Sequence, residues 1–229
     1  MIIALNHKSN FTKDEILDYL KDYKKLNTNN HKMILIPSAC YLSLMPNNIV
    51  FGSEDVSSKE MGAYTGEISA EAIKSLGATY TLINHSERNT KMNENLAISK
   101  QKLEKAFSSN LIPIICIGDT QEEHKSGIYV DKIKKDMDYL LSDIDKSKDF
   151  IIAYEPIFAI GTGLVPENND IEKVTTMLKE IYQKEILYGG SANEDNIEEL
   201  QKVKNIDGFL LGGISLKLHS LQKFFNKLQ

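Results

Sequence analysis

The chain has 229 residues, a length that fits either two small domains or one large α/β barrel. Its 27 Lys and Arg residues against 32 Asp and Glu residues give a net charge of −5, which argues against nonspecific binding to nucleic acid or to an anionic membrane. No apolar run approaches the roughly 20 residues that cross a bilayer. We therefore expect a soluble protein with no nucleic-acid partner and no membrane partner.

The first residues and the cysteines favour a cytoplasmic protein. Residues 1–6 contain no basic region and only a short apolar run, which is typical of a strand and not of a signal peptide. Cys40 and Cys116 belong to no C-x-x-C pair, so neither a disulfide framework nor a structural zinc site is expected. This pattern is consistent with a reducing cytosol.

Eight short runs, most of them apolar at consecutive positions, predict parallel strands that are buried on both faces. In chain order these runs are 2–5, 33–37, 49–52, 78–84, 111–118, 150–155, 186–190 and 206–212. Between them, apolar residues three or four positions apart predict helices. The predicted helices cover 14–26, 94–107, 130–141, 171–182, 196–203 and 216–228.

This alternation predicts one (β/α)8 barrel domain over residues 1–229 with eight parallel strands. No linker or low-complexity tract divides the chain. A doubly wound open sheet is the alternative, but its G-x-G-x-x-G motif should follow the first strand, where the sequence has Asn6, His7, Lys8 and Ser9.

Glycines cluster just beyond the last three predicted strands. They are Gly161 and Gly163, Gly189 and Gly190, and Gly212 and Gly213. In a parallel barrel these strand ends form one rim, where phosphate is often held by the loops after strands 7 and 8. Because glycine lets backbone N–H groups approach an anion closely, the pairs predict an anion site.

Polar residues suited to catalysis or ligand binding end the first and fourth predicted strands. Asn6 and Lys8 are two positions apart, which places both side chains on the same side of an extended segment, and the lysine favours an anionic ligand. Taken alone, such a lysine is most often a solvated rim residue. His85 precedes a polar segment that predicts a helix start, where the helix dipole keeps the imidazole neutral and able to donate a hydrogen bond to a carbonyl.

Glu155 ends the sixth predicted strand, immediately before Pro156. A carboxylate at this position is partly desolvated in the mouth of a barrel, which suits a general base. The segment 156–166 that follows is apolar, carries glycines and is bounded by prolines. Because loops exposed to water are normally polar, this segment predicts a lid that closes over a ligand.

Specific motifs recur along the chain in a fixed order, and together they resemble the triosephosphate isomerase family from Asn6 to Leu216. The motifs are Asn6-x-Lys8, the segment 62–69 (GAYTGEIS), His85-Ser86-Glu87-Arg88, 116–118 (CIG), 153–156 (AYEP), 159–163 (AIGTG), 188–191 (YGGS) and 207–213 (DGFLLGG).

The resemblance implies a TIM barrel that interconverts dihydroxyacetone phosphate and D-glyceraldehyde 3-phosphate through a cis-enediolate, in glycolysis and gluconeogenesis. It implies no cofactor, no metal and a small triose phosphate as the ligand. By the same resemblance Glu155 is the base and His85 is the electrophile that polarises the carbonyl. Lys8 offsets the charge of the enediolate and phosphate, and Asn6 binds a substrate oxygen.

The resemblance also implies supporting roles. The residues that match phosphate-gripping positions are Gly161, Ser191, Gly212 and Gly213. The segment 157–162 corresponds to the lid, which Tyr188 and Ser191 latch when it is closed. Ser86 corresponds to the partner of the base when the lid is open, and Glu87 to the carboxylate that tethers Lys8.

Members of this family are generally homodimers, in which a long loop enters a pocket of the partner. The matching segment here is 55–69, with Thr65 at the tip that reaches the neighbour's Asn6. Arg88 is the single arginine of the chain, which hints at a contact that lysine cannot replace. We expect Arg88 at or near the dimer interface, with a local salt bridge as the alternative.

Four positions depart from the usual pattern of the family. Leu164 replaces a common Lys after the lid, Phe158 a common Trp, Asn84 the Gly before the histidine, and Asn89 a frequent second Arg. Two other functions remain open at this point: a non-catalytic homologue that binds triose phosphate, and an isomerase for a larger sugar phosphate.

Overall fold

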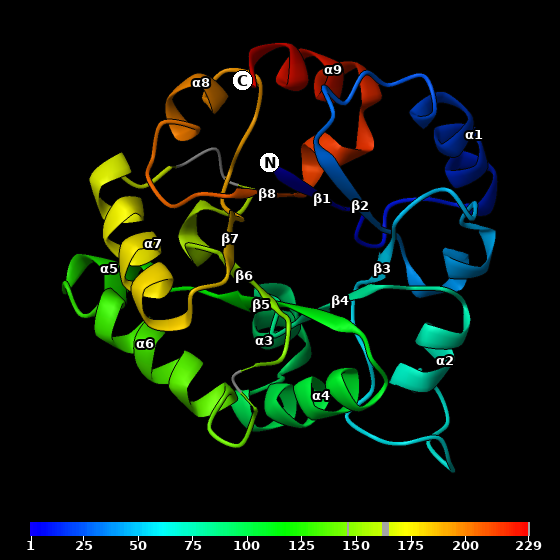
Figure 1. Cartoon of the computed structure of the whole chain (residues 1–229), viewed down its shortest axis with the longest axis horizontal. Coiled ribbons are helices and arrows are strands. Elements are labelled where there is room, and N and C mark those ends of the chain that lie inside the picture. Colours follow the sequence, from blue (N-terminus) through cyan, green and yellow to red (C-terminus); the bar gives the residue numbers. More distant parts are fainter. Residues whose placement is uncertain (146, 162–164, 229) are drawn as a thin grey trace.

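The computed structural model describes residues 1–145, 147–161 and 165–228, and its strands form a barrel surrounded by helices (Figure 1). The strands are β1 (Ile2–Asn6), β2 (Lys32–Ile36), β3 (Gly52–Ser53), β4 (Tyr80–Ile83), β5 (Ile112–Ile117), β6 (Ile151–Tyr154), β7 (Glu185–Tyr188) and β8 (Gly208–Leu211). The α-helices are α1 (Lys13–Tyr23), α2 (Ala70–Ser75), α3 (Ser86–Met92), α4 (Leu96–Ser108), α5 (Gln121–Lys125), α6 (Tyr129–Leu140), α7 (Asn168–Tyr182), α8 (Ile197–Leu200) and α9 (Leu218–Lys227). Short 3-10 helices are η1 (Ala39–Leu44), η2 (Ile157–Ala159) and η3 (Gly213–Leu216).

All paired strands are parallel, and the sheet has the order β2-β1-β8-β7-β6-β5-β4-β3. A single parallel bridge between Leu35 and Phe51 joins the two edges. The sheet is therefore a closed ring of eight strands, as expected for a (β/α)8 barrel, and the open-sheet alternative is wrong.

Strand residues alternate between two apolar layers. In β1, Ile2 and Ala4 belong to the cluster inside the barrel, whereas Ile3 and Leu5 pack outward beneath the helices. Because both faces are buried, the strands are apolar at consecutive positions, which explains the runs in the sequence. Within the described part of the chain, none of the helices is both long and apolar enough to span a membrane.

The predicted strands are confirmed within a few residues, but the third is much reduced. The run 49–52 predicted four strand residues, whereas β3 holds two residues and Phe51 contributes only the bridge to Leu35. The connection from β2 to β3 contains η1 in place of an α-helix. Prolines at positions 37 and 46 flank η1 within this connection and limit the length of any helix between them.

The six predicted helices are all present, but that predicted over 196–203 is shortened to the four residues of α8. α2 and α5 were not predicted, because six and five residues are too few to show a helical period. α3 begins directly after His85, as the polar segment predicted.

Candidate active site

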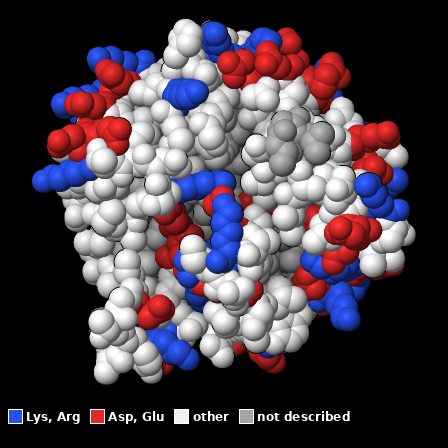
Figure 2. Space-filling model, turned by 180° about the vertical axis from the view of Figure 1, so that it is seen from behind, with Lys and Arg blue, Asp and Glu red and all other residues white. Residues whose placement is uncertain are grey.

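Eight of the predicted site residues line one cavity of about 250 Å³ at the carboxyl ends of the strands. They are Asn6, Lys8, His85, Glu155, Gly161, Ser191, Gly212 and Gly213. A larger cavity of about 690 Å³ adjoins it and shares Asn6, Lys8 and His85. Figure 2 shows side chains of both charges lying side by side around a hollow near the middle of one face of the molecule.

His85 caps α3 and holds its own ring in a defined state. The backbone N–H of Glu87 donates to His85 Nδ1 over 3.2 Å. Because Nδ1 accepts this bond, the proton of the neutral ring is on Nε2. Nε2 lies 3.2 Å from Glu155 Oε1 and 3.4 Å from Asn6 Nδ2.

Glu155 is buried, with 2% of its surface exposed, and its second oxygen accepts a 3.2 Å hydrogen bond from the backbone N–H of Ser86. Gly189 makes room for it, because a Cβ atom at that glycine would lie 2.8 Å from Glu155 Cγ. The neighbouring Cys116 remains a thiol, since burial and the Glu155 carboxylate raise the pKa of this cysteine well above its usual value.

Lys8 reaches the same cavity by a route that differs from the sequence prediction. β1 ends at Asn6, and Lys8 has φ +52°, so the segment is not extended through Lys8. A positive φ is uncommon for lysine and is typical of strained functional positions. The backbone N–H of Lys8 donates to Asn6 Oδ1 over 3.1 Å, and Lys8 Nζ lies 3.2 Å from Glu87 Oε1. This leaves the Nδ2 donor of Asn6 facing the cavity beside His85.

Glycines form another part of the wall of the cavity. Gly161 has φ +68°, a conformation that favours glycine, and the side chain of Lys8 passes 3.3 Å from the Cβ position of Gly212. Ser191 donates its hydroxyl hydrogen bond to the carbonyl of Ala159, at the start of the predicted lid. Thr162 of that lid and the neighbouring Gly163 and Leu164 lie outside the described residues.

Tyr188 is fully buried, and its hydroxyl has no hydrogen-bond partner among the residues that the structure describes. The hydroxyl lies beside the glycine pair, since a Cβ atom at Gly190 would be 2.3 Å from it. Thr65 is exposed in the segment 55–69 and does not line the smaller cavity.

Arg88 takes part in a cluster of four charges with Asp55, Glu94 and Lys102. Its Nε atom lies 3.2 Å from Asp55 Oδ2, and both Nε and a terminal nitrogen donate to Glu94 Oε1. Lys102 Nζ bonds Asp55 Oδ2 at 2.6 Å and Glu94 Oε1 at 2.7 Å. The fork of the guanidinium thus makes contacts that one lysine nitrogen cannot make, as the isolated arginine suggested.

A second network supports the start of the lid, and no pattern in the sequence points to it. Asp119 accepts hydrogen bonds from Tyr154 Oη at 3.0 Å and lies 2.8 Å from His124 Nδ1. Burial raises the pKa of Asp119. Its carbonyl binds the N–H of Ile157, and the ring of Phe158 lies 5.0 Å from that of His124. Asp119 and His124 therefore hold the segment that follows Glu155.

A carboxylate, an imidazole and an ammonium meet at the strand ends of a (β/α)8 barrel, which is the arrangement of a barrel enzyme that moves protons. A family model described as triosephosphate isomerase matches residues 1–228. The chain belongs to the triosephosphate isomerase family.

Relatives with that name align over nearly their whole length. The protein of Mycoplasmopsis pulmonis (strain UAB CTIP) is 36% identical, with 100% of this chain and 99% of the relative covered. The protein of Wolbachia pipientis wMel is 37% identical, with 100% and 94% covered, and that of Alkaliphilus metalliredigens (strain QYMF) is 36% identical, with 94% of each covered.

Proposed function

We propose that the chain interconverts dihydroxyacetone phosphate and D-glyceraldehyde 3-phosphate. The observation that carries this proposal is the convergence of Glu155, His85 and Lys8 on one small cavity. Membership of the family supports the same reaction. Nothing in the site favours the non-catalytic alternative, because each of the four polar groups that the chemistry needs lines the cavity.

In the proposed reaction Glu155 removes the proton from the hydroxyl-bearing carbon beside the substrate carbonyl. The electron pair moves into the new carbon–carbon double bond and the carbonyl oxygen becomes an enediolate oxygen. The same carboxyl group then returns a proton to the former carbonyl carbon. The proton of the neighbouring hydroxyl passes to the former carbonyl oxygen, so carbonyl and hydroxyl exchange places and the isomerisation is complete. Proton transfer of this kind needs a base and an electrophile and no cofactor or metal.

His85 and Asn6 supply the electrophilic side. With Nδ1 occupied by the Glu87 N–H, His85 presents Nε2–H, and Asn6 presents Nδ2 beside it. Two donors 3.4 Å apart cannot bond each other. When substrate is bound, both can donate to an oxygen of the enediolate, with Nε2 exchanging its 3.2 Å contact with Glu155 Oε1 for that oxygen. The ammonium of Lys8 balances the negative charge of the enediolate and the phosphate.

We propose that the backbone at Gly161, Gly212 and Gly213, with Ser191, holds the phosphate. A phosphate gripped away from the reacting carbons limits its elimination from the enediolate, particularly where the lid excludes water. The bond from Ser191 to the Ala159 carbonyl supports a link between this side of the site and the lid. Tyr188 is proposed to contact the lid when it closes.

We also propose a homodimer in which the segment 55–69 enters the partner, with Thr65 near the partner's site and Arg88 at its base. The exposed apolar side chains of this segment support the proposal: Met61 is 71% exposed, Tyr64 47% and Ile68 42%. The 690 Å³ cavity beside Asn6, Lys8 and Arg88 is the proposed acceptor for the same segment of a second copy. A cytoplasmic location is proposed on the free cysteines Cys40 and Cys116.

The proposed reaction is tested by following purified protein and dihydroxyacetone phosphate in D₂O by ¹H NMR. We expect glyceraldehyde 3-phosphate to form and deuterium to enter at the carbon next to the carbonyl. A folded protein that gives neither product nor deuterium incorporation would contradict the proposal. Turnover of a pentose phosphate at a comparable rate would favour the larger-substrate alternative.

A further inference from the structure

Asn84 is a buried residue that directly precedes His85, and no role has been assigned to it so far. Its backbone has φ +63°, and 7% of its surface is exposed. Among residues other than glycine, Asn is one of those that adopt this left-handed conformation most readily. A glycine would satisfy the backbone alone, so the conformation does not explain the amide side chain.

The side chain of Asn84 joins three elements around the end of β4. Its Nδ2 donates to the carbonyl of Cys116 on β5 over 2.8 Å, and its Oδ1 accepts from Ser99 Oγ on α4 over 2.9 Å. Asn89 Nδ2 on α3 lies 3.0 Å from the same Oδ1 and 3.2 Å from the Asn84 carbonyl. Ser99 and Cys116 are fully buried, so these bonds are shielded from water.

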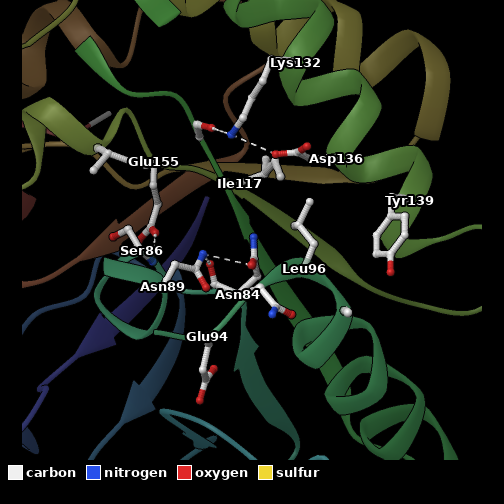
Figure 3. A pocket seen from close by; sticks show the side chains of 14 residues that line it. Asn84, Ser86, Asn89, Glu94, Leu96, Ile117, Lys132, Asp136, Tyr139 and Glu155 are labelled. Atoms are coloured by element: carbon white, nitrogen blue, oxygen red, sulfur yellow. Dashed lines mark hydrogen bonds and ion pairs between the residues drawn. The ribbon is translucent and has the colours of Figure 1, made fainter. Parts of the chain in front are cut away.

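The groups fixed by this network are those that hold the proposed base and electrophile. α3 begins two residues after Asn84, at Ser86, whose N–H binds Glu155, and the next N–H binds His85 Nδ1. Asn89 lies on the same helix, so its bond to Asn84 ties α3 to the end of β4. Figure 3 shows Asn84 and Asn89 directed toward each other, with Ser86 and Glu155 alongside.

On the side where α3 borders a cavity, packing alone does not fix the position of the helix. A cavity of about 510 Å³ lies against Asn84, Ser86 and Asn89, between them and the side chains of Leu96 and Tyr139 (Figure 3). Where side-chain atoms have no packed neighbours, directional hydrogen bonds take over the task of fixing their geometry. The Asn84–Asn89 contact therefore constrains α3 beside this cavity.

We infer that Asn84 is a positioning residue, which acts through Asn89, Ser99 and the Cys116 carbonyl to set the placement of His85 and of the Ser86 N–H that holds Glu155. This inference rests on the proposed function. Asn84 does not touch the substrate. It affects the stabilisation of the transition state through the groups that it orients.

The test is Asn84→Gly, which keeps the left-handed backbone and removes the amide. We expect kcat to fall about 10- to 100-fold, since small misplacements of reacting groups have effects of this size, while KM stays within about twofold. Affinity for 2-phosphoglycolate, whose carboxylate resembles the enediolate, should fall by a similar factor, while affinity for glycerol 3-phosphate is unchanged. The matched control is Asn110→Gly at an exposed asparagine with φ +56°, which should leave kcat unchanged.

A double-mutant cycle with Asn89→Leu tests whether the two amides act as one unit. If they do, Asn84→Gly/Asn89→Leu has a kcat close to that of Asn84→Gly alone, and independent effects would multiply instead. Should Asn84→Gly prove unfolded in a thermal melt, Ser99→Ala removes one bond to Asn84 and should lower kcat in the same direction by a smaller factor, whereas unchanged kcat would overturn the inference.

A wild-type kcat in Asn84→Gly, or a rise in KM with kcat unchanged, would contradict the positioning role. An inactive wild-type protein would contradict the proposed function instead. In that case the ratio of 2-phosphoglycolate affinities between wild type and Asn84→Gly still decides the inference, because equal affinities overturn it.

Discussion

The Nε2 atom of His85 and the Oε1 atom of Glu155 lie 3.2 Å apart, although the two residues follow different strands of the barrel. Each is held from behind by a backbone N–H at the start of α3, Glu87 N for the imidazole and Ser86 N for the carboxylate. One short segment therefore fixes the proposed base and the proposed electrophile relative to each other.

Replacing Lys8 with Met is expected to raise KM and lower kcat together. The ammonium faces the cavity and is expected to interact with the phosphate in the ground state and with the enediolate in the transition state. The measurement is steady-state kinetics with glyceraldehyde 3-phosphate. Lys91→Met is the control, because Lys91 Nζ also lies 3.2 Å from Glu87 Oε1 but is 65% exposed and outside the smaller cavity. Equal kcat and KM values for Lys8→Met and Lys91→Met would show that Lys8 is a solvated charge at the rim with no role in binding or turnover.

Lys102→Met is expected to lower the free energy of unfolding by about 3 kcal/mol or more, since it leaves the carboxylates of Asp55 and Glu94 with one cation fewer in a buried cluster. Lys105→Met, also on α4, removes a partner of the exposed Glu60 and should cost less than about 1 kcal/mol. Urea unfolding of both variants measures the difference. Similar losses in the two would show that the cluster contributes no more than a surface pair.

Replacing His7 with Leu is expected to reduce the loss of stability in acid. Burial lowers the pKa of His7 from 6.5 to about 4, so between these values the unfolded chain binds a proton that the folded chain does not. The free energy of unfolding of the wild type therefore falls as the pH drops through this window, by about 3 kcal/mol from this group. Both ring nitrogens of His7 are without partners among the described residues, so Leu leaves no bond unmade there.

The measurement for His7 is urea unfolding at about pH 7 and about pH 4 for the wild type and His7→Leu. The difference between the two pH values should be about 3 kcal/mol smaller in the variant. His219→Leu changes an exposed histidine and should leave the difference as in the wild type. A His7→Leu difference equal to that of the wild type would show that His7 is not a source of acid lability.

The substitution Met61→Asp is expected to weaken the proposed homodimer. Met61 is the most exposed of the large apolar side chains in the segment 55–69, and burying a carboxylate against a partner is unfavourable. Sedimentation velocity should show monomers for this variant at concentrations where the wild type is dimeric. Ile128→Asp, at a side chain that is 55% exposed on a different part of the barrel, should remain dimeric. A monomeric wild type would remove the homodimer proposal.

The sequence predicted the eight strands and eight of the residues that line the smaller cavity, because buried parallel strands are apolar throughout and polar residues and glycines at their ends stand out. Lys8 was correctly predicted at the cavity, but on the assumption that the chain is extended from Asn6 to Lys8. The φ of +52° at Lys8 ends the extended segment, and residue spacing carries no information on this angle. Spacing does not show how far pairing extends either, which is why β3 was predicted too long.

Contacts between distant side chains were the least predictable part of the site. In the sequence Asn84 stands out only as a departure from the family pattern, although its amide joins α3, α4 and β5. Lys102 and His124 stood on ordinary helical faces, and their carboxylate partners come from elsewhere in the sequence. Such contacts depend on three-dimensional packing that no local pattern specifies.

The most direct test of the central claim is a coupled turnover assay with glyceraldehyde 3-phosphate on wild type, Glu155→Gln and Glu155→Asp. We expect rapid isomerisation by the wild type, none above background in Glu155→Gln, and a kcat lowered about 100-fold or more in Glu155→Asp, whose carboxylate is withdrawn by one bond. Circular dichroism melts should confirm that all three proteins are folded. Turnover by Glu155→Gln at the wild-type rate would contradict the assignment of Glu155 as the base.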